Sequence, residues 1–152
     1  LSLWQNRLTG SIPPELGNLV DLVELYLDDN LLTGSIPAEL GQLTNLQYLL
    51  LGPNLLQGSI PPELGNLTGL SELWLHENHL SGAIPAELGN LTNLREDAFG
   101  LKLCLNSLVS EDPSLTDFLD TKHDPGDWQD CQAIHWDDFE LGDLSFWSFF
   151  TP

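Results

Sequence analysis

The sequence predicts an α/β solenoid, in which about five coils of 24 residues stack with a parallel β-sheet on the concave face and a helical cap covers the C-terminal end. Three observations predict it. Residues recur with a fixed period of 24, each period contains a strand pattern followed by a short helical pattern, and the period ends before a segment with helix start signals. A repeat of this length cannot bury its own apolar side chains, so consecutive copies must stack.

Four columns of identical residues carry the period. Each column recurs every 24 positions over the first 85 residues, which excludes an accident of composition. The columns are the asparagines Asn6, Asn30, Asn54 and Asn78, the leucines Leu3, Leu27, Leu51 and Leu75, the glycines Gly10, Gly34, Gly58 and Gly82, and the prolines Pro13, Pro37, Pro61 and Pro85.

Each unit reads as a strand, a turn and a short helical turn. Leu25 and Leu27 are two positions apart, so both side chains lie on one face of a strand and Tyr26 points the other way. Pro37 stands where a helical turn can begin and Gly41 where it can stop. At the turn after each strand, an inward asparagine amide can satisfy backbone groups that would otherwise be buried unpaired. The expected asparagine ladder consists of Asn6, Asn30, Asn54, Asn78 and Asn106.

These units resemble leucine-rich repeats of the plant-specific type, whose mark is Leu-x-Gly-x-Ile-Pro after the asparagine. The motif stands at Leu8–Pro13, Leu32–Pro37, Leu56–Pro61 and Leu80–Pro85, and the resemblance covers residues 1–108. It implies a second short sheet at the Ile-Pro segment and a twisted solenoid. It also implies a secreted or cell-surface recognition module that binds a protein, peptide or glycan.

The fifth unit departs from the pattern. Asp97 and Lys102 stand where leucine and asparagine are due, and a shift of four residues restores the motif at Leu101 and Asn106. We therefore expect an insertion of four residues within 95–100, which forms a loop before the last strand. Such a loop would change the rim of the concave face without disturbing the core.

Residues 109–132 predict a capping helix and loop, and residues 133–152 an acidic aromatic tail. Asp112 is a suitable N-cap and Pro113 suits the first helical position. Leu115, Phe118 and Leu119 then share one helix face. The segment resembles the C-terminal cap of many bacterial leucine-rich-repeat proteins.

Two cysteines allow one internal disulfide. We expect Cys104 and Cys131 to pair, which would join the last strand to the end of the cap and constrain the unfolded chain. The alternative is a pair of buried free thiols, because cytosolic repeat proteins also bury cysteine.

Charge and composition exclude several classes of partner. The chain has 23 acidic and 4 basic side chains, a formal net charge of −19, which argues against nucleic acid and anionic membranes. Because no apolar run approaches the roughly 18 residues of a spanning helix, we expect no membrane insertion.

Catalytic candidates are few, and we expect a protein without enzymatic activity, cofactor or metal. His76 and His79 lie near Glu77, but no serine or cysteine has the spacing of a nucleophile. Asp28 and Asp29 are neighbours whose side chains diverge. The acidic residues of 124–143 lack calcium-motif spacing, and we read them as solvated surface.

The concave face is the expected ligand-binding site. Large apolar side chains that face outward on a sheet and are rimmed by carboxylates are typical of a recognition surface. Alternatively, the aromatic residues are good strand formers that only cover their neighbours. We expect Tyr26, Tyr48, Leu50 and Trp74 to be anchors, Glu24, Asp28 and Glu72 to select a basic group, and His76 to adjoin them.

A structural role is the alternative function. Apolar side chains of the first coil would form an end that upstream repeats or a second copy must cover, and head-to-tail stacking of copies would build a filament. The side chains concerned are Leu1, Leu3, Leu8, Ile12, Leu16 and Leu19. An enzyme inhibitor is a third possibility, since plant polygalacturonase inhibitors share the repeat type.

Overall fold

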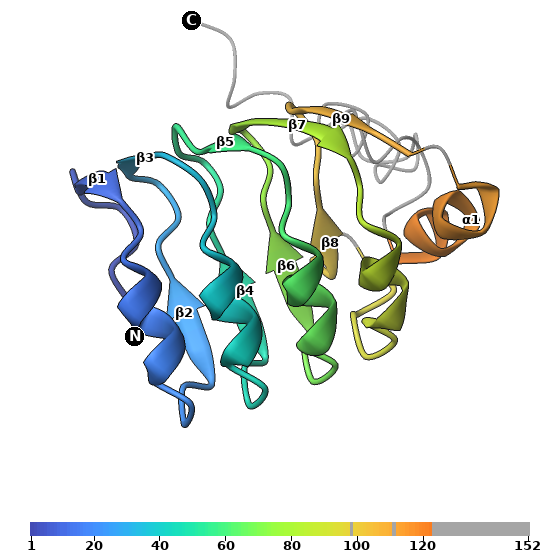
Figure 1. The fold of residues 1–152 in the computed structure, drawn as a ribbon, viewed down its shortest axis with the longest axis horizontal. Coiled ribbons are helices and arrows are strands. Elements are labelled where there is room, and N and C mark those ends of the chain that lie inside the picture. Colours follow the sequence, from blue (N-terminus) through green and yellow to red (C-terminus); the bar gives the residue numbers. More distant parts are fainter. Residues whose placement is uncertain (98, 111, 123–152) are drawn as a thin grey trace, which may run out of the picture.

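The computed structural model describes residues 1–97, 99–110 and 112–122. These residues form a curved stack of coils, which confirms the predicted solenoid (Figure 1). The coils contribute short strands to one side of the stack and short helices to the other.

The main sheet is parallel and four-stranded, in the order β2, β4, β6, β8. Leu25 pairs with Leu49 and Leu49 with Leu73, so the step between coils is 24 residues, whereas Leu73 pairs with Leu101 at a step of 28. The four additional residues therefore lie between β6 and β8, in the segment that contains 95–100. The strands are Glu24–Tyr26, Tyr48–Leu50, Glu72–Trp74 and Leu101–Lys102.

Further parallel strands line the edge that follows each asparagine turn. In the first four coils they are built by residues that precede Ile-Pro, and not by Ile-Pro itself as the resemblance implied. The motif glycines lie in or directly after these strands, at φ between 78° and 91°. This backbone region is open to glycine at no steric cost. The strands are β1 (Thr9–Ser11) with β3 (Leu31–Thr33), and β5 (Gln57–Gly58) with β7 (His79–Ala83) and β9 (Ser107–Val109).

The helical turns on the outer side are 3-10 helices, η1 to η4. Pro37 is the residue before its helix, and Gly41 lies inside the helix, so the expectation that Gly41 ends it is wrong. The glycine serves packing, because a Cβ atom there would lie 2.7 Å from the backbone carbon of Glu63 in the next coil. The helices span Pro14–Asn18, Ala38–Gln42, Pro62–Asn66 and Ala86–Asn90.

Leucines fill the interior along the whole stack. The two core leucines of each strand region, such as Leu49 and Leu51, are completely buried in the central coils. Ile12 is also buried, so it does not belong to the apolar end expected for the first coil, and Leu16 is partly buried. The exposed members of that end are Leu1, Leu3, Leu8 and Leu19.

The asparagine side chains connect neighbouring coils. Asn54 donates from Nδ2 to the carbonyl oxygens of Leu51 in its own coil and Leu27 in the preceding coil, at 2.8 and 2.9 Å. Its Oδ1 accepts from the backbone N–H of Leu32 at 2.9 Å. Asn30, Asn78 and Asn106 repeat this arrangement. Asn6 is exposed, and its side chain bonds only carbonyl groups of its own turn among the described residues.

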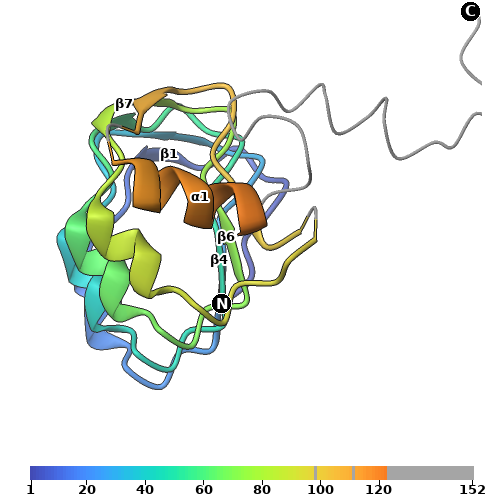
Figure 2. The same cartoon turned by 90° about the vertical axis from the view of Figure 1, so that its right-hand side faces the viewer.

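Helix α1 (Pro113–Lys122) lies across the C-terminal end of the stack (Figure 2). Asp112 Oδ1 accepts from the backbone N–H of Ser114 at 2.8 Å, which caps the helix. Leu115 and Leu119 are buried against the last coil, and Phe118 packs beside them. The rest of the expected cap and the acidic aromatic tail lie outside the described residues.

The expected disulfide stays a prediction. Cys104 is 1% exposed at the end of the last main strand region. Cys131 lies outside the described residues.

Candidate functional site

The parallel register places six of the eight predicted ligand-binding side chains in two rows across the main sheet. The other two, Asp28 and His76, follow Tyr26 and Trp74 by two positions. One row contains Tyr26, Leu50, Trp74 and Lys102, which pair in that order. The row before it contains Glu24, Tyr48 and Glu72. Because neighbouring strands are about 4.8 Å apart, side chains in one row are close enough to contact each other.

Two tyrosines form an aromatic pair on the first two strands of the sheet. The rings of Tyr26 and Tyr48 meet edge to face, with centroids 6.3 Å apart and planes at 72°. Both side chains are half-buried. Leu50 is only 9% exposed, so it forms the floor beside these rings and offers little surface of its own. Burial, followed by Glu24, raises the pKa of Tyr26, so its phenol remains a hydrogen-bond donor at neutral pH.

Two carboxylates flank the tyrosines. Glu24 is exposed, and Asp28 is half-buried. Asp28 Oδ1 is buried and has no hydrogen-bond partner among the described residues. Burial raises the pKa of Asp28, which is the cost of holding a charge without a partner. We call Glu24, Tyr26, Asp28 and Tyr48 the tyrosine surface.

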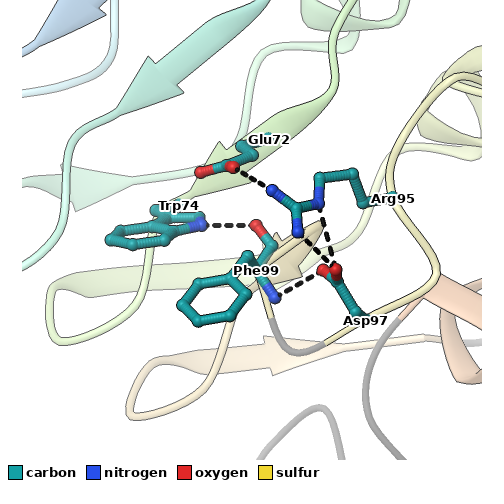
Figure 3. Close-up of polar contacts among 5 residues, drawn as sticks. All are labelled: Glu72, Trp74, Arg95, Asp97 and Phe99. Atoms are coloured by element: carbon teal, nitrogen blue, oxygen red, sulfur yellow. Dashed lines mark hydrogen bonds and ion pairs between the residues drawn. The ribbon is translucent and has the colours of Figure 1, made fainter.

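The insertion loop covers the other half of the predicted site (Figure 3). Trp74 Nε1 donates a hydrogen bond to the carbonyl oxygen of Phe99 at 2.6 Å. The two rings stack with centroids 6.3 Å apart and planes at 27°. Trp74 is therefore in contact with a loop of its own chain, and Phe99, which is 49% exposed, presents an aromatic ring beside it.

Glu72 is engaged by the same loop. Arg95 Nη1 lies 3.0 Å from Glu72 Oε1, and the guanidinium also bonds Asp97 Oδ2 from Nε at 3.0 Å and from Nη2 at 2.5 Å. These bonds lower the pKa of Asp97, first through the hydrogen bond from Arg95. The Glu72 side chain is 12% exposed. Its charge thus has a partner within the chain, in contrast to Glu24 and Asp28.

Lys102 completes the group around the loop. Its Nζ lies 3.7 Å from the ring centroid of Trp74 and 5.5 Å from that of Phe99. The sequence marked 95–100 as an insertion and placed Lys102 in the central row, but it gave no signal that Arg95 and Phe99 fold back onto the sheet. We call Glu72, Trp74, Arg95, Asp97, Phe99 and Lys102 the insertion cluster.

His76 lies beside Trp74, with ring centroids 5.9 Å apart. Burial, followed by the charge of Lys102 and opposed by Asp29, lowers the pKa of His76 to about 4. Its Nδ1 is buried without a hydrogen-bond partner among the described residues. The ring is therefore neutral at pH 7.

This pKa predicts a pH-dependent stability. An unfolded histidine titrates near 6.5, so between pH 6.5 and about 4 the unfolded chain binds a proton that folded His76 does not. The stabilisation is present above pH 6.5 and is lost as the pH falls. Urea titrations at pH 7.5 and 4.5 should show that the wild type loses about 2 kcal/mol more unfolding free energy than His76→Asn. Comparing the loss in the two proteins cancels the contribution of the carboxylates, which titrate in both. An equal loss of unfolding free energy in both proteins would contradict the lowered pKa of His76.

The described residues contain no cluster of three or more histidine, cysteine, aspartate or glutamate side chains arranged to hold a metal ion. None of the helices in this part of the chain is long and apolar enough to cross a membrane. The arrangement offers aromatic contacts, carboxylates and one half-buried ammonium, which are the components of a binding surface.

Comparisons with solved structures identify similar proteins. The Arabidopsis receptor kinase HAESA, solved with the peptide hormone IDA and the co-receptor SERK1, is 41% identical with a TM-score of 0.71, over 80% of this chain and 20% of that chain. The plant peptide hormone receptor RGFR1, solved with RGF2, is 36% identical with a TM-score of 0.69, over 82% and 23%. The BIR2 ectodomain from Arabidopsis thaliana is 37% identical with a TM-score of 0.65, over 71% and 55%.

The matched region therefore spans less than a quarter of the two hormone receptors and about half of BIR2. A comparison with curated proteins found no match. A family model described as Leucine Rich Repeat matches residues 1–19, 21–43, 45–67 and 69–91, which is more than half of the chain. The chain belongs to the leucine-rich repeat family, and its repeats are of the plant type.

Proposed function

We propose that this chain is a non-enzymatic extracellular recognition module that binds a peptide through the tyrosine surface. The observation that carries the proposal is the edge-to-face pair of Tyr26 and Tyr48 beside a carboxylate, Asp28, one of whose oxygens is buried without a partner among the described residues. Aromatic side chains next to unsatisfied polar groups are typical anchors of binding sites. The similarity to HAESA and RGFR1, both solved with peptide hormones, supports a peptide as the ligand class.

The chemistry of the tyrosine surface favours a basic side chain in that peptide. Glu24 and Asp28 supply two carboxylates without an ion-pair partner among the described residues, and the tyrosine rings can accept a cation on their faces. The net charge of −19 also attracts cationic ligands from a distance. Because Glu72 is paired with Arg95, we assign the selection of the basic group to Glu24 and Asp28 and not to Glu72.

Extracellular location is part of the same proposal. The BIR2 match is to an ectodomain, and a disulfide between Cys104 and Cys131 would suit an oxidising compartment. We do not extend the proposal to filament assembly, because the exposed leucines of the first coil are explained equally by the contact that a preceding coil would make.

A peptide selection tests this function. The wild-type chain is immobilised and used to select binders from a random twelve-residue library, and the bound sequences should be enriched in lysine or arginine next to an aromatic or aliphatic residue. One selected peptide is then synthesised. Its affinity should fall at least about tenfold for the double variant Tyr26→Ala, Tyr48→Ala, the size expected for loss of buried aromatic anchors.

The matched control is Leu55→Ala, which removes a 41% exposed side chain outside the tyrosine surface. This variant should bind the peptide as the wild type does. Urea midpoints of all three proteins show whether the variants remain folded. Equal affinity of the wild type and the folded double variant would refute the proposed site.

A further inference from the structure

Lys102 is a half-buried cation without an anionic partner among the described residues. Its Nζ makes no hydrogen bond or ion pair there, although the whole chain has 23 acidic side chains. The other partly or fully buried cation of the described segments, Lys122, pairs with Glu96 at 2.9 Å. Arg95, which is more exposed, pairs with two carboxylates. Lys102 therefore differs from both in its surroundings.

The aromatic rings around Lys102 compensate only part of the hydration that its ammonium group loses on burial. Trp74 and Phe99 offer π faces to the ammonium, but they cannot accept three directed hydrogen bonds. Burial lowers the pKa of Lys102, and Glu72 acts in the opposite direction. A charged group in this position gains most from an acceptor that brings negative charge.

Glu72 does not fill this role, although it is near. Its Oε1 is bound by Arg95 at 3.0 Å, and Arg95 is in turn held by Asp97. The loop thus neutralises the carboxylate that would otherwise pair with the lysine or repel an incoming anion. The result is an ammonium group without an anionic partner in the described part of the chain, at the C-terminal side of the sheet. The tyrosine surface carries carboxylates at the N-terminal side.

We propose that Lys102 is an anion subsite that binds a carboxylate of the peptide held by the tyrosine surface. The inference rests on the proposed function and adds a second charge requirement to it. Lys102 is three strand steps from Tyr26, which is about 14 Å across the sheet, and Asp28 lies two residues, or about 7 Å, further along the strand direction. The diagonal between Asp28 and Lys102 is therefore about 16 Å, which an extended chain covers in about five residues. The ligand therefore carries a basic side chain and a carboxylate about five residues apart.

Two peptide libraries separate the two sources of a carboxylate. In one library both ends of the random segment are joined to further polypeptide, so that only aspartate and glutamate side chains supply a carboxylate. In the other the C-terminus is free. Selections use the wild type, Lys102→Gln, Lys102→Arg and the matched control Arg7→Gln, which removes an exposed positive charge in the first coil.

With the wild type and Arg7→Gln, we expect acidic residues, or the free terminus, about five residues from the basic residue. Lys102→Gln should lose this enrichment, and Lys102→Arg should keep it. A selected peptide whose carboxylate is converted to an amide should bind the wild type at least tenfold more weakly, with little change for Lys102→Gln. Urea midpoints verify that the variants are folded.

The outcomes distinguish the two proposals. The selected peptides could carry a basic residue, bind Tyr26→Ala more weakly than the wild type, and show no preference for acidic residues. This result would overturn the role of Lys102 and leave the tyrosine surface supported. An equal loss of acidic preference in Arg7→Gln and Lys102→Gln would also overturn it, because the effect would then be one of net charge. Peptides without a basic residue, bound equally by Tyr26→Ala, would overturn the proposed function.

Discussion

Replacing Asn54 by leucine is expected to lower the free energy of unfolding by about 2 kcal/mol, because the buried N–H of Leu32 loses its acceptor. The carbonyl groups of Leu27 and Leu51 each lose one of two asparagine donors and keep the other, which comes from the neighbouring rung of the ladder. The amide bonds Leu51 and Leu27 through Nδ2 and the N–H of Leu32 through Oδ1, all within 2.9 Å. Leucine has a similar volume but cannot replace any of these bonds. The loss is measured from urea unfolding followed by circular dichroism.

The same substitution in the first coil is the control. Asn6 occupies the equivalent position of the repeat, but it is exposed and its side chain bonds only Leu3 and Trp4 among the described residues. We expect Asn6→Leu to change the unfolding free energy by less than about 1 kcal/mol, since water can satisfy the groups it releases. Equal effects at the two positions would show that bridging between coils does not account for the asparagine column.

Gly65→Ala is expected to destabilise the chain by about 1–3 kcal/mol through overpacking. A Cβ atom at this position would lie 2.6 Å from the Cβ atom of Glu87 and 2.7 Å from its carbonyl carbon. These atoms belong to the next coil and include backbone, so the two 3-10 helices would have to separate.

Gly89 provides a matched control for this glycine. It has the same place in helix η4 that Gly65 has in η3, but a Cβ atom there meets no atom of the described residues within 4 Å. Gly89→Ala should leave stability unchanged or raise it by up to about 1 kcal/mol, because alanine reduces the entropy of the unfolded chain. Thermal unfolding of both variants tests the contrast, and comparable losses would point to helix conformation instead of the distance between coils.

The 24-residue period predicted the fold because residues that are one period apart occupy equivalent environments in successive coils. Leu49 and Leu51 are buried because they occupy the positions of Leu25 and Leu27 in the next coil. The four-residue shift at Leu101 follows from the positions of the repeat motif in the sequence. The start of α1 followed from the Asp112-Pro113 pair. These features depend on local pattern and on stacking, both of which a single sequence records.

The candidate site was only partly predictable, because contacts made by a non-repeating loop have no template in the other coils. The pattern placed Glu72 and Trp74 on the concave face, but the positions of Arg95 and Phe99 depend on the conformation of the inserted segment. The role of Gly41 was missed for a related reason, since it requires the distance between coils. Leu50 faces the predicted side, yet neighbouring side chains cover it.

The step of 28 residues between β6 and β8 has an evolutionary consequence. Strand β8 joins the sheet in line with its predecessors despite the extra length, so the number of residues in this connection is uncoupled from the leucine interior. Natural variation can lengthen, shorten or recompose the connection without a large loss of stability. Related chains can thereby diversify what they recognise while they inherit the same scaffold.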